Sequence, residues 1–242
     1  MLFSIMIYFA IIMVIVLIRL LSQYAKNENK HTLKYYKNEY QDIIKNSFSD
    51  NKKNLLTLLR ALRFYNEDKY RHASILLCSL LSKCKTENER YSVNLFLALV
   101  NSDFGNTENA ILIYENMVDI GIADSRVFSN MLILYKDKGD YEKAYNAGLR
   151  AIEASPGNSN AYNNFAYFLF SDGNYEEAKT YAKKCLSIKN NAIESITLLY
   201  IIYTLEENEE EAEVYRKKAI ANGRSQKELK EIIESYIGKE EE

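Results

Sequence analysis

Apolar residues recur at helical spacing through the middle of this chain. From residue 128 they fall at i, i+3, i+4 and i+7, which indicates a helix with one buried face; they are Phe128, Met131, Leu132 and Tyr135. Gly139 and Asp140 follow, and a second stripe then comprises Tyr141, Ala144, Gly148, Ala151 and Ile152. Glycine suits a helix end because it adopts positive φ without strain, and aspartate can cap the next helix. The pattern predicts two helices joined by a tight turn and closed by Pro156.

The same turn recurs along the chain with its phase kept. Gly105, Gly139 and Gly173 are each 34 residues apart, and the same step separates Ala110, Ala144, Ala178 and Ala212. A fixed period of this length indicates stacked copies of one supersecondary unit. The 242 residues include only 8 Gly and 1 Pro, and this scarcity of chain breakers favours helices over strands and turns.

These residues resemble the tetratricopeptide repeat (TPR) family, in which helix A carries a bulky residue, a Leu, a small residue and a Tyr, and helix B carries Ala, an aromatic, Ala and Pro. The strongest unit supplies Phe128, Tyr135, Gly139, Tyr141, Ala144, Ala151 and Pro156, and the next supplies Tyr162, Gly173, Tyr175 and Ala178. The outer units are placed mainly by phase, through Gly105 and Ala110 upstream and Ala212 downstream. The resemblance implies an all-α protein, a right-handed α-solenoid of TPR-type helical hairpins.

Domain boundaries follow from this phase. We expect a transmembrane anchor at 1–21, a polar and partly helical connector at 22–53, about five repeats with a C-terminal capping helix at 54–237, and an acidic tail at 238–242. The repeats are 54–90, 91–124, 125–158, 159–192 and 193–226. Ala73 precedes Ala110 by 37 residues instead of 34, so we place three additional residues between 83 and 89.

Residues 2–18 contain no charged side chain. About 20 residues at about 1.5 Å each cover the roughly 30 Å core of a bilayer. A cleaved signal peptide is the alternative, but no Lys or Arg precedes the apolar run. Positive residues follow it instead, namely Arg19, Lys26, Lys30, Lys34 and Lys37. The positive-inside rule therefore predicts a single-pass membrane protein with its repeats in the cytoplasm.

The connector contains apolar residues at helical spacing, among them Tyr40, Ile43 and Ile44. Two interpretations are open. The segment is a helix that covers the first repeat, or an interfacial helix whose lysines face anionic lipid.

The resemblance also implies a concave groove lined by the A helices, where such proteins bind an extended peptide or another protein. The matching positions in this chain are Arg126, Asn130, Ile133, Asn160, Asn163, Asn164, Tyr167, Thr197 and Ile201. Asn130 and Asn164 occupy equivalent positions 34 residues apart. An amide side chain both donates and accepts hydrogen bonds, so it can pair with a peptide unit whatever the side chain. The alternative is that these asparagines are simply solvated.

Other functions are disfavoured. A net charge of −2 argues against a general nucleic-acid binder. Three cysteines (Cys78, Cys84 and Cys185) and two histidines (His31 and His72) predict neither a metal site nor a disulfide framework, and we expect the thiols to be buried or half-buried. No Gly-rich phosphate loop, nucleophile elbow or His-Glu-x-x-His motif occurs, so we expect no enzyme, no cofactor and no small-molecule substrate.

The sequence therefore predicts a membrane-tethered scaffold or adaptor of bacterial type, which binds a protein or extended peptide during assembly or regulation of a membrane complex. The alternative is an extracytoplasmic TPR protein in envelope assembly or secretion.

Overall fold

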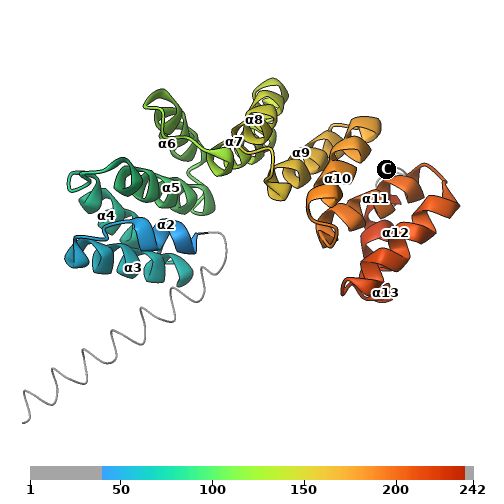
Figure 1. The fold of residues 1–242 in the computed structure, drawn as a ribbon, viewed down its shortest axis with the longest axis horizontal. Coiled ribbons are helices and arrows are strands. Elements are labelled where there is room, and N and C mark those ends of the chain that lie inside the picture. Colours follow the sequence, from blue (N-terminus) through green and yellow to red (C-terminus); the bar gives the residue numbers. More distant parts are fainter. Residues whose placement is uncertain (1–39, 238–242) are drawn as a thin grey trace, which may run out of the picture. The chain divides into compact units, whose positions relative to one another are not determined.

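The computed structural model describes residues 40–237, in which helices are joined by short turns and no strand occurs (Figure 1). Its helices are α2 (Gln41–Asn46), α3 (Lys52–Asn66), α4 (Tyr70–Leu81), α5 (Glu87–Asp103), α6 (Thr107–Asp119), α7 (Ser125–Asp137), α8 (Tyr141–Ala154), α9 (Ser159–Ser171), α10 (Tyr175–Ile188), α11 (Ile193–Leu205), α12 (Glu209–Ala221) and α13 (Gln226–Ile237). The expected anchor, most of the connector and the acidic tail lie outside the described residues. Within residues 40–237, none of the helices combines the length and the hydropathy needed to cross a bilayer.

The chain forms two compact units, Met1–Ile122 and Ala123–Glu242. The first contains α2 and the hairpins α3–α4 and α5–α6. The second contains the hairpins α7–α8, α9–α10 and α11–α12, followed by α13. Within a unit, the second helix of one hairpin packs on the first helix of the next, as α4 does on α5 and α8 does on α9. The expected all-α architecture of repeated helical hairpins is confirmed.

The second unit keeps the 34-residue step in its helix boundaries. Helices α8, α10 and α12 begin at Tyr141, Tyr175 and Glu209. The residue before each is Asp or Asn, and its side chain accepts a hydrogen bond from a backbone N–H in the first turn. The capping residues are Asp140, Asn174 and Asn208. Such a bond satisfies one of the backbone donors that a helix start leaves unpaired, which fixes the start of each second helix.

The turn inside each hairpin requires a left-handed residue. Gly139 and Gly173 have φ of 76° and 78°, a region that glycine adopts without steric cost. At the equivalent positions of the first and last hairpins, Asp68 and Glu207 have φ of 55° and 57°. The turn conformation is therefore kept even where the glycine is not.

The three additional residues upstream are accommodated as helix. Helix α5 has 17 residues, whereas α7, α9 and α11 have 13 each. Its start is fixed by a capping box, in which the Thr86 side chain bonds the Glu89 backbone and the Glu89 side chain bonds the Thr86 backbone.

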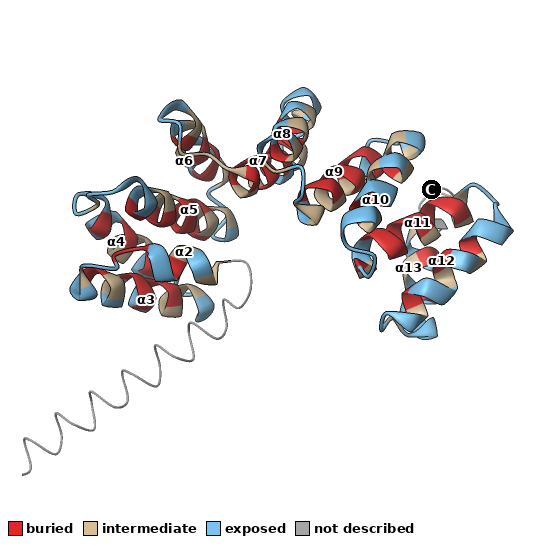
Figure 2. Ribbon diagram, in the orientation of Figure 1, coloured by how far each residue is buried: buried red, intermediate tan, exposed pale blue. Residues whose placement is uncertain are grey.

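Helix α2 covers part of the first unit. Tyr40 lies against Phe96 of α5 with ring centroids 5.6 Å apart. Ile44 and Phe48 are buried in the same apolar core as Leu58 of α3. For the described end of the connector, these contacts support a segment that covers the first repeat (Figure 2).

Close helix packing in the second unit depends on Gly148 of α8. A Cβ atom at this position would lie 2.3 Å from Cδ2 of Phe165 and 2.7 Å from Cδ1 of Leu132. Only glycine therefore lets α8 approach both α7 and α9 this closely. Phe165 is completely buried and also contacts Tyr145 and Tyr181 edge-on.

Helix α13 closes the end of the second unit. Leu229 is buried, Ile233 is nearly so, and the helix contacts α11. Tyr236 reaches α9, where its ring lies 5.3 Å from that of Phe170. Helix α13 therefore packs against two of the first helices of the hairpins, α9 and α11.

Candidate functional site

The candidate surface is formed by α7 and α9, which are neighbours in the second unit. On α7, Arg126 is held at the helix start, because its Nη2 and Nε lie 2.7 and 3.0 Å from Oδ2 of Asp124. Asp124 also caps α7 through its other carboxylate oxygen. Asn130 is half-buried and Ile133 is 40% exposed. The charge of Arg126 is thus offset within the chain, and Ile133 offers an apolar contact.

The asparagines of α9 differ in what they bind. Oδ1 of Asn163 accepts a hydrogen bond of 2.7 Å from the hydroxyl of Ser195, which connects α9 to α11. Asn160 is exposed and Asn164 is half-buried. Within the described residues, neither of these two side-chain amides forms a hydrogen bond. Asn164 therefore has both donor and acceptor capacity available beside α7.

Tyr167 follows one turn further along α9. Its hydroxyl donates a hydrogen bond of 3.1 Å to the backbone carbonyl of Glu194. Burial, aided by the nearby Tyr236 and Glu194, raises the pKa of Tyr167 to about 12. The phenol is therefore neutral at physiological pH, and it connects α9 to the start of α11.

The predicted positions on α11 are not at the surface. Thr197 is 2% exposed and Ile201 is 1% exposed. The Thr197 hydroxyl donates to the backbone carbonyl of Ile193 within its own helix. A helix that is apolar on all sides is generally buried, and Leu198, Leu199, Ile201 and Ile202 give α11 this character. The candidate surface is therefore narrower than expected and is confined to α7 and α9.

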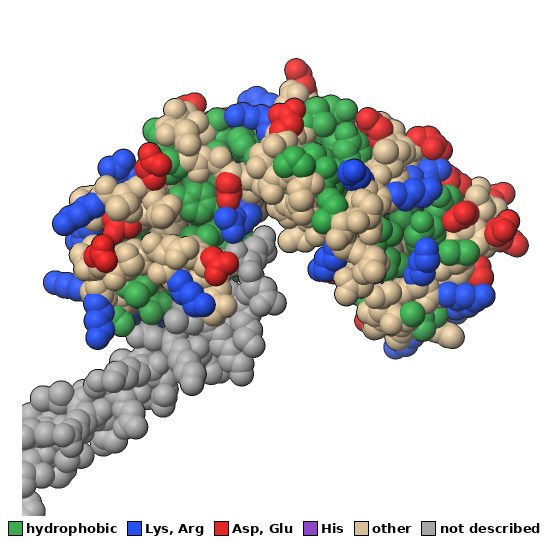
Figure 3. All heavy atoms as spheres, viewed as in Figure 1, with side chains coloured by type: hydrophobic (Ala, Val, Ile, Leu, Met, Phe, Trp, Pro, Cys, Tyr) green, Lys and Arg blue, Asp and Glu red, His purple; other side chains and the backbone are tan. Residues whose placement is uncertain are grey.

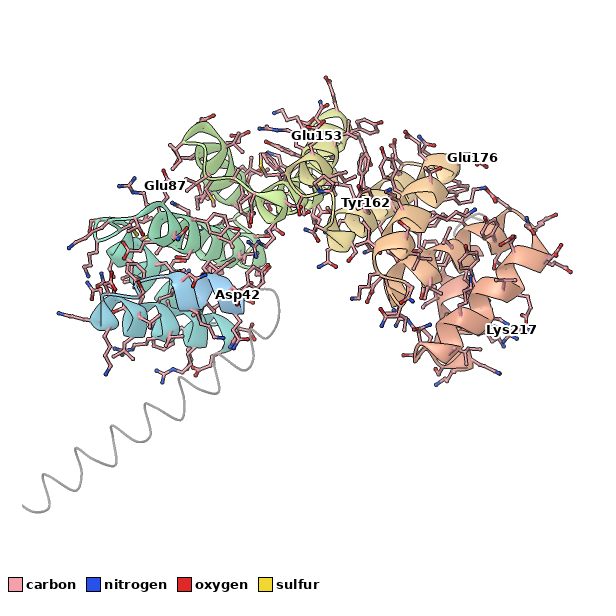
Figure 4. The ribbon with its side chains drawn as sticks, viewed as in Figure 1. Asp42, Glu87, Glu153, Tyr162, Glu176 and Lys217 are labelled. Carbon is pink, nitrogen blue, oxygen red and sulfur yellow. The ribbon has the colours of Figure 1, made fainter. Side chains whose placement is uncertain are left out.

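Most of the repeat-signature side chains lie in the interiors of the two units. Those buried are Ala110, Phe128, Tyr135, Ala144, Ala151, Tyr162, Ala178 and Ala212. Tyr175 is half-buried and stacks on Phe170, whereas Tyr141 and Pro156 are exposed. Charged residues such as Glu153, Glu176 and Lys217 lie instead on the second helices α8, α10 and α12 (Figure 4).

The cysteines differ in their surroundings. Cys185 is buried and Cys84 is half-buried, and burial raises the pKa of the Cys84 thiol to about 11. Cys78 on α4 is exposed, so the expectation of burial is wrong for this thiol. Among the described residues, no group of three or more His, Cys, Asp or Glu side chains could hold a metal ion.

An open hollow of about 610 Å³ lies beside α13 and away from the predicted positions. Its lining residues are Tyr200, Arg216, Gln226, Lys227, Leu229, Lys230, Ile233 and Glu234. Because it is wide open and rimmed by charged side chains, it lacks the enclosed apolar form of a small-molecule site.

Comparisons with known proteins agree with this architecture. Residues 147–180 match the tetratricopeptide repeat family; they comprise the end of α8, all of α9 and the start of α10. No curated protein matches the sequence.

Solved structures of other proteins share the fold. A crystal structure of MamA has a TM-score of 0.58 at 19% identity, covering 67% of this chain and 93% of its own. YrrB, described as a TPR protein with an unusual peptide-binding site, has a TM-score of 0.56 at 15% identity, covering 81% of this chain and 97% of its own. A double mutant of MamA from RS-1 has a TM-score of 0.59 at 13% identity, covering 73% of this chain and 97% of its own. In sequence at residues 147–180 and in fold over most of its length, this chain is similar to tetratricopeptide repeat proteins.

Proposed function

We propose that this protein is a membrane-tethered TPR scaffold or adaptor that binds an extended segment of another protein along α7 and α9, during assembly or regulation of a membrane complex. The observation that carries the proposal is the Asn164 amide, half-buried on α9 and without a hydrogen bond in the described structure. The equivalent residue of α7 is Asn130.

The spacing of these helices suits an extended chain. Adjacent packed helices lie about 8–10 Å apart, and an extended chain advances about 3.3 Å per residue. Amides on successive helices would therefore contact peptide units about three residues apart. Ile133 and Tyr167 are also equivalent positions, 34 residues apart, and would provide apolar contacts between the amides. The peptide-binding site named for YrrB, which has the same fold, is consistent with this proposal.

Site-specific photo-crosslinking tests the surface. A photoreactive residue in place of Ile133 should give discrete crosslinked products in cells, because Ile133 is 40% exposed on α7. The matched control is the same residue in place of Thr180, which is exposed on the outer helix α10. Identical products from both positions, or none from position 133, would contradict the proposal.

The role of the amides is tested by removing them. Asn130→Ala combined with Asn164→Ala should lower the crosslink yield from position 133 at least about tenfold, because each lost hydrogen bond contributes about 1 kcal/mol. The control combines Asn109→Ala with Asn146→Ala, both exposed on second helices, and should leave the yield unchanged. An unchanged yield in the first variant, with the fold intact by circular dichroism, would exclude the amides from binding.

Tethering and orientation are supported by the apolar run at residues 2–18 and by the cations that follow it. Cys78 provides the test, since it is exposed, whereas Cys185 is buried and burial raises the pKa of Cys84 to about 11. An impermeant thiol reagent should label Cys78 only after the membrane is opened, and Cys78→Ser should abolish labelling. Labelling in intact cells would favour the extracytoplasmic alternative, in envelope assembly or secretion. Release of the protein by alkaline extraction would contradict tethering.

A further inference from the structure

The first hairpin carries an unbalanced positive charge. Residues 51–86, which contain α3 and α4, include eight Lys and Arg residues but only two acidic residues, a formal charge of +6. The next hairpin, residues 87–122, has one Arg and six acidic residues, a formal charge of −5. The two hairpins of the first unit therefore have opposite charge, and the positive one is nearer in sequence to the apolar run at residues 2–18.

Most of these cations are at the surface and lack acidic partners. Six of them, namely Lys52, Lys53, Arg60, Arg71, Lys83 and Lys85, are exposed and form no ion pair with another described residue. The two acidic residues are engaged locally: Glu67 lies 2.6 Å from Nζ of Lys69, and Asp68 accepts a hydrogen bond from the Tyr70 hydroxyl. Figure 3 shows Lys and Arg side chains along the α3–α4 edge of the first unit.

Aliphatic side chains of the same two helices are exposed as well. Ile75 of α4 is 66% exposed, the highest exposure among the large apolar side chains of the described structure. Leu56 is 43% exposed and Leu81 is 37% exposed. On α3, Lys52, Leu56 and Arg60 follow at intervals of four residues, so they share one helix face.

A second basic cluster surrounds Phe64 at the turn of the hairpin. The charged groups of Arg60, Arg63 and Lys69 lie 5.7, 5.4 and 5.9 Å from the centre of its ring. The His72 ring lies 5.3 Å from the same ring. Three cations and one histidine thus gather around one half-buried aromatic ring, near the end of α3 and the start of α4.

We propose that the outer surface of α3 and α4 is a second membrane contact, which binds the anionic headgroups of a lipid bilayer. The unpaired Lys and Arg side chains would lie among the headgroups, and Leu56, Ile75 and Leu81 would enter the boundary with the acyl chains. Cations around exposed aliphatic residues form the combination that binds membrane surfaces. Long Lys and Arg side chains also let their charges reach headgroups while their stems lie on apolar surface.

The aliphatic residues favour a bilayer over a soluble polyanion. Nucleic acids and acidic peptides bind to positive charge, but their binding does not require exposed aliphatic residues such as Ile75 and Leu81. The contact goes beyond the proposed peptide-binding function, since it involves the first unit and needs no residue of α7 or α9. It would hold this unit on the bilayer surface.

The test uses the full-length chain labelled at Cys78 with a fluorophore that responds to a quencher in the lipid headgroup region. Cys78 lies on α4 three residues after Ile75, on the exposed side. The control label is placed by Cys78→Ser with Val214→Cys; Val214 is 41% exposed on α12, at the repeat position equivalent to Ile75. Each protein is added to phosphatidylcholine vesicles with or without phosphatidylserine.

We expect strong quenching at position 78 on the vesicles that contain phosphatidylserine, weak quenching on the others, and none at position 214. Lys52→Gln with Lys53→Gln and Arg60→Gln should remove this difference, because each cation near an anionic surface raises affinity about fivefold. Ile75→Ser should also reduce quenching without changing charge, whereas Val214→Ser should not. High salt should remove the part of the quenching that depends on Lys and Arg, because salt screens their attraction to the anionic headgroups.

Equal quenching at positions 78 and 214 would overturn the proposal, and so would quenching that is unchanged by the three charge substitutions. A third contrary outcome is protection of Cys78 by polyglutamate without quenching by vesicles. That result would assign the surface to an acidic protein. The tether is scored separately by sedimentation with pure phosphatidylcholine vesicles. Failure to sediment with these vesicles counts against the tether alone, because quenching on anionic vesicles still measures contact between the α3–α4 hairpin and the bilayer.

Discussion

The middle hairpins, α7–α8 and α9–α10, differ from the end hairpins, α3–α4 and α11–α12, in sequence far more than in backbone. The middle ones have glycine at the turn, whereas the end ones have Asp68 and Glu207, yet all four residues adopt positive φ. The middle hairpins are nearly balanced in charge, but the end ones are strongly basic or acidic. The four hairpins therefore share one backbone conformation at the turn, whereas the identity of the turn residue and the charge of the surface differ between them.

One position of the second helix, which is buried in the middle hairpins, differs as well. In the middle hairpins it holds Gly148 and Ala182, and in the end hairpins it holds Leu77 and Arg216. Small residues let neighbouring helices approach closely, so the middle of the array is held by tight packing. At the C-terminal end Arg216 borders the open hollow beside α13 instead.

The largest expected effect is at this position. Gly148→Val should lower the free energy of unfolding by about 2–3 kcal/mol, because a Cβ atom would lie 2.3 Å from the Phe165 ring. Urea denaturation measures the change. The control is Gly157→Ala, where a Cβ atom meets nothing within 4 Å and little change is expected. Equal effects in the two variants would show that close approach at residue 148 is unimportant.

Helix capping distinguishes equivalent positions in the two units. Asn174→Ala should cost about 1 kcal/mol, because its side chain accepts a hydrogen bond from the backbone of Glu177 at the start of α10. Asn106 holds the same repeat position before α6 but makes no side-chain capping bond, so Asn106→Ala should cost far less. Thermal unfolding measures the loss of stability in each variant. A larger loss in Asn106→Ala than in Asn174→Ala would contradict this role of the capping bond.

Restoring the missing glycine should stabilise the last hairpin. Glu207→Gly should raise the free energy of unfolding by about 0.5–1 kcal/mol, since a residue other than glycine is strained at φ of 57°. Glu210→Gly removes the same charge from the first turn of α12, where a carboxylate favours the helix and glycine does not, so it should instead destabilise. Denaturation midpoints of the pair separate the two effects, and a loss of stability in Glu207→Gly would show that the turn does not favour glycine.

The smallest effect is a titration in the last hairpin. Hydrogen bonds from Arg216 lower the pKa of Glu213 to about 2 from its usual 4.5. Any stability from this exposed pair is present above pH 4.5 and is lost as the pH falls toward 2. Arg216→Gln should return the pKa of Glu213 toward 4.5, as carbon-detected NMR titration would show. A pKa that stays near 2 in this variant would assign the shift to another cause.

Phase alone predicts much of the fold. The 34-residue step places the starts of α8, α10 and α12, and the mismatch at Ala73 locates the additional residues before α5. The family positions predicted Thr197 and Ile201 at the surface, but both are buried because α11 is apolar on all sides. The exposure of Cys78 could have been predicted from the sequence. Ala73, Leu77 and Leu80 define the buried side of α4 by their helical spacing, and Cys78 does not share it.

Predicting the candidate site was harder for a physical reason. Asparagines that are neighbours in the sequence can form different hydrogen bonds, and only tertiary packing decides which side-chain amide is engaged within the fold. Asn163 bonds Ser195, whereas Asn164, one residue later, forms no such bond. A single sequence cannot separate two neighbouring residues of this kind.

The capping box of Thr86 and Glu89 has a consequence for protein engineering. Because the extra length before α5 is absorbed as one more helical turn, the neighbouring hairpins keep their own spacing. Residues 82–86 are thus a natural place to graft an epitope or a fluorescent domain, provided that the graft ends before Thr86 and leaves the box intact.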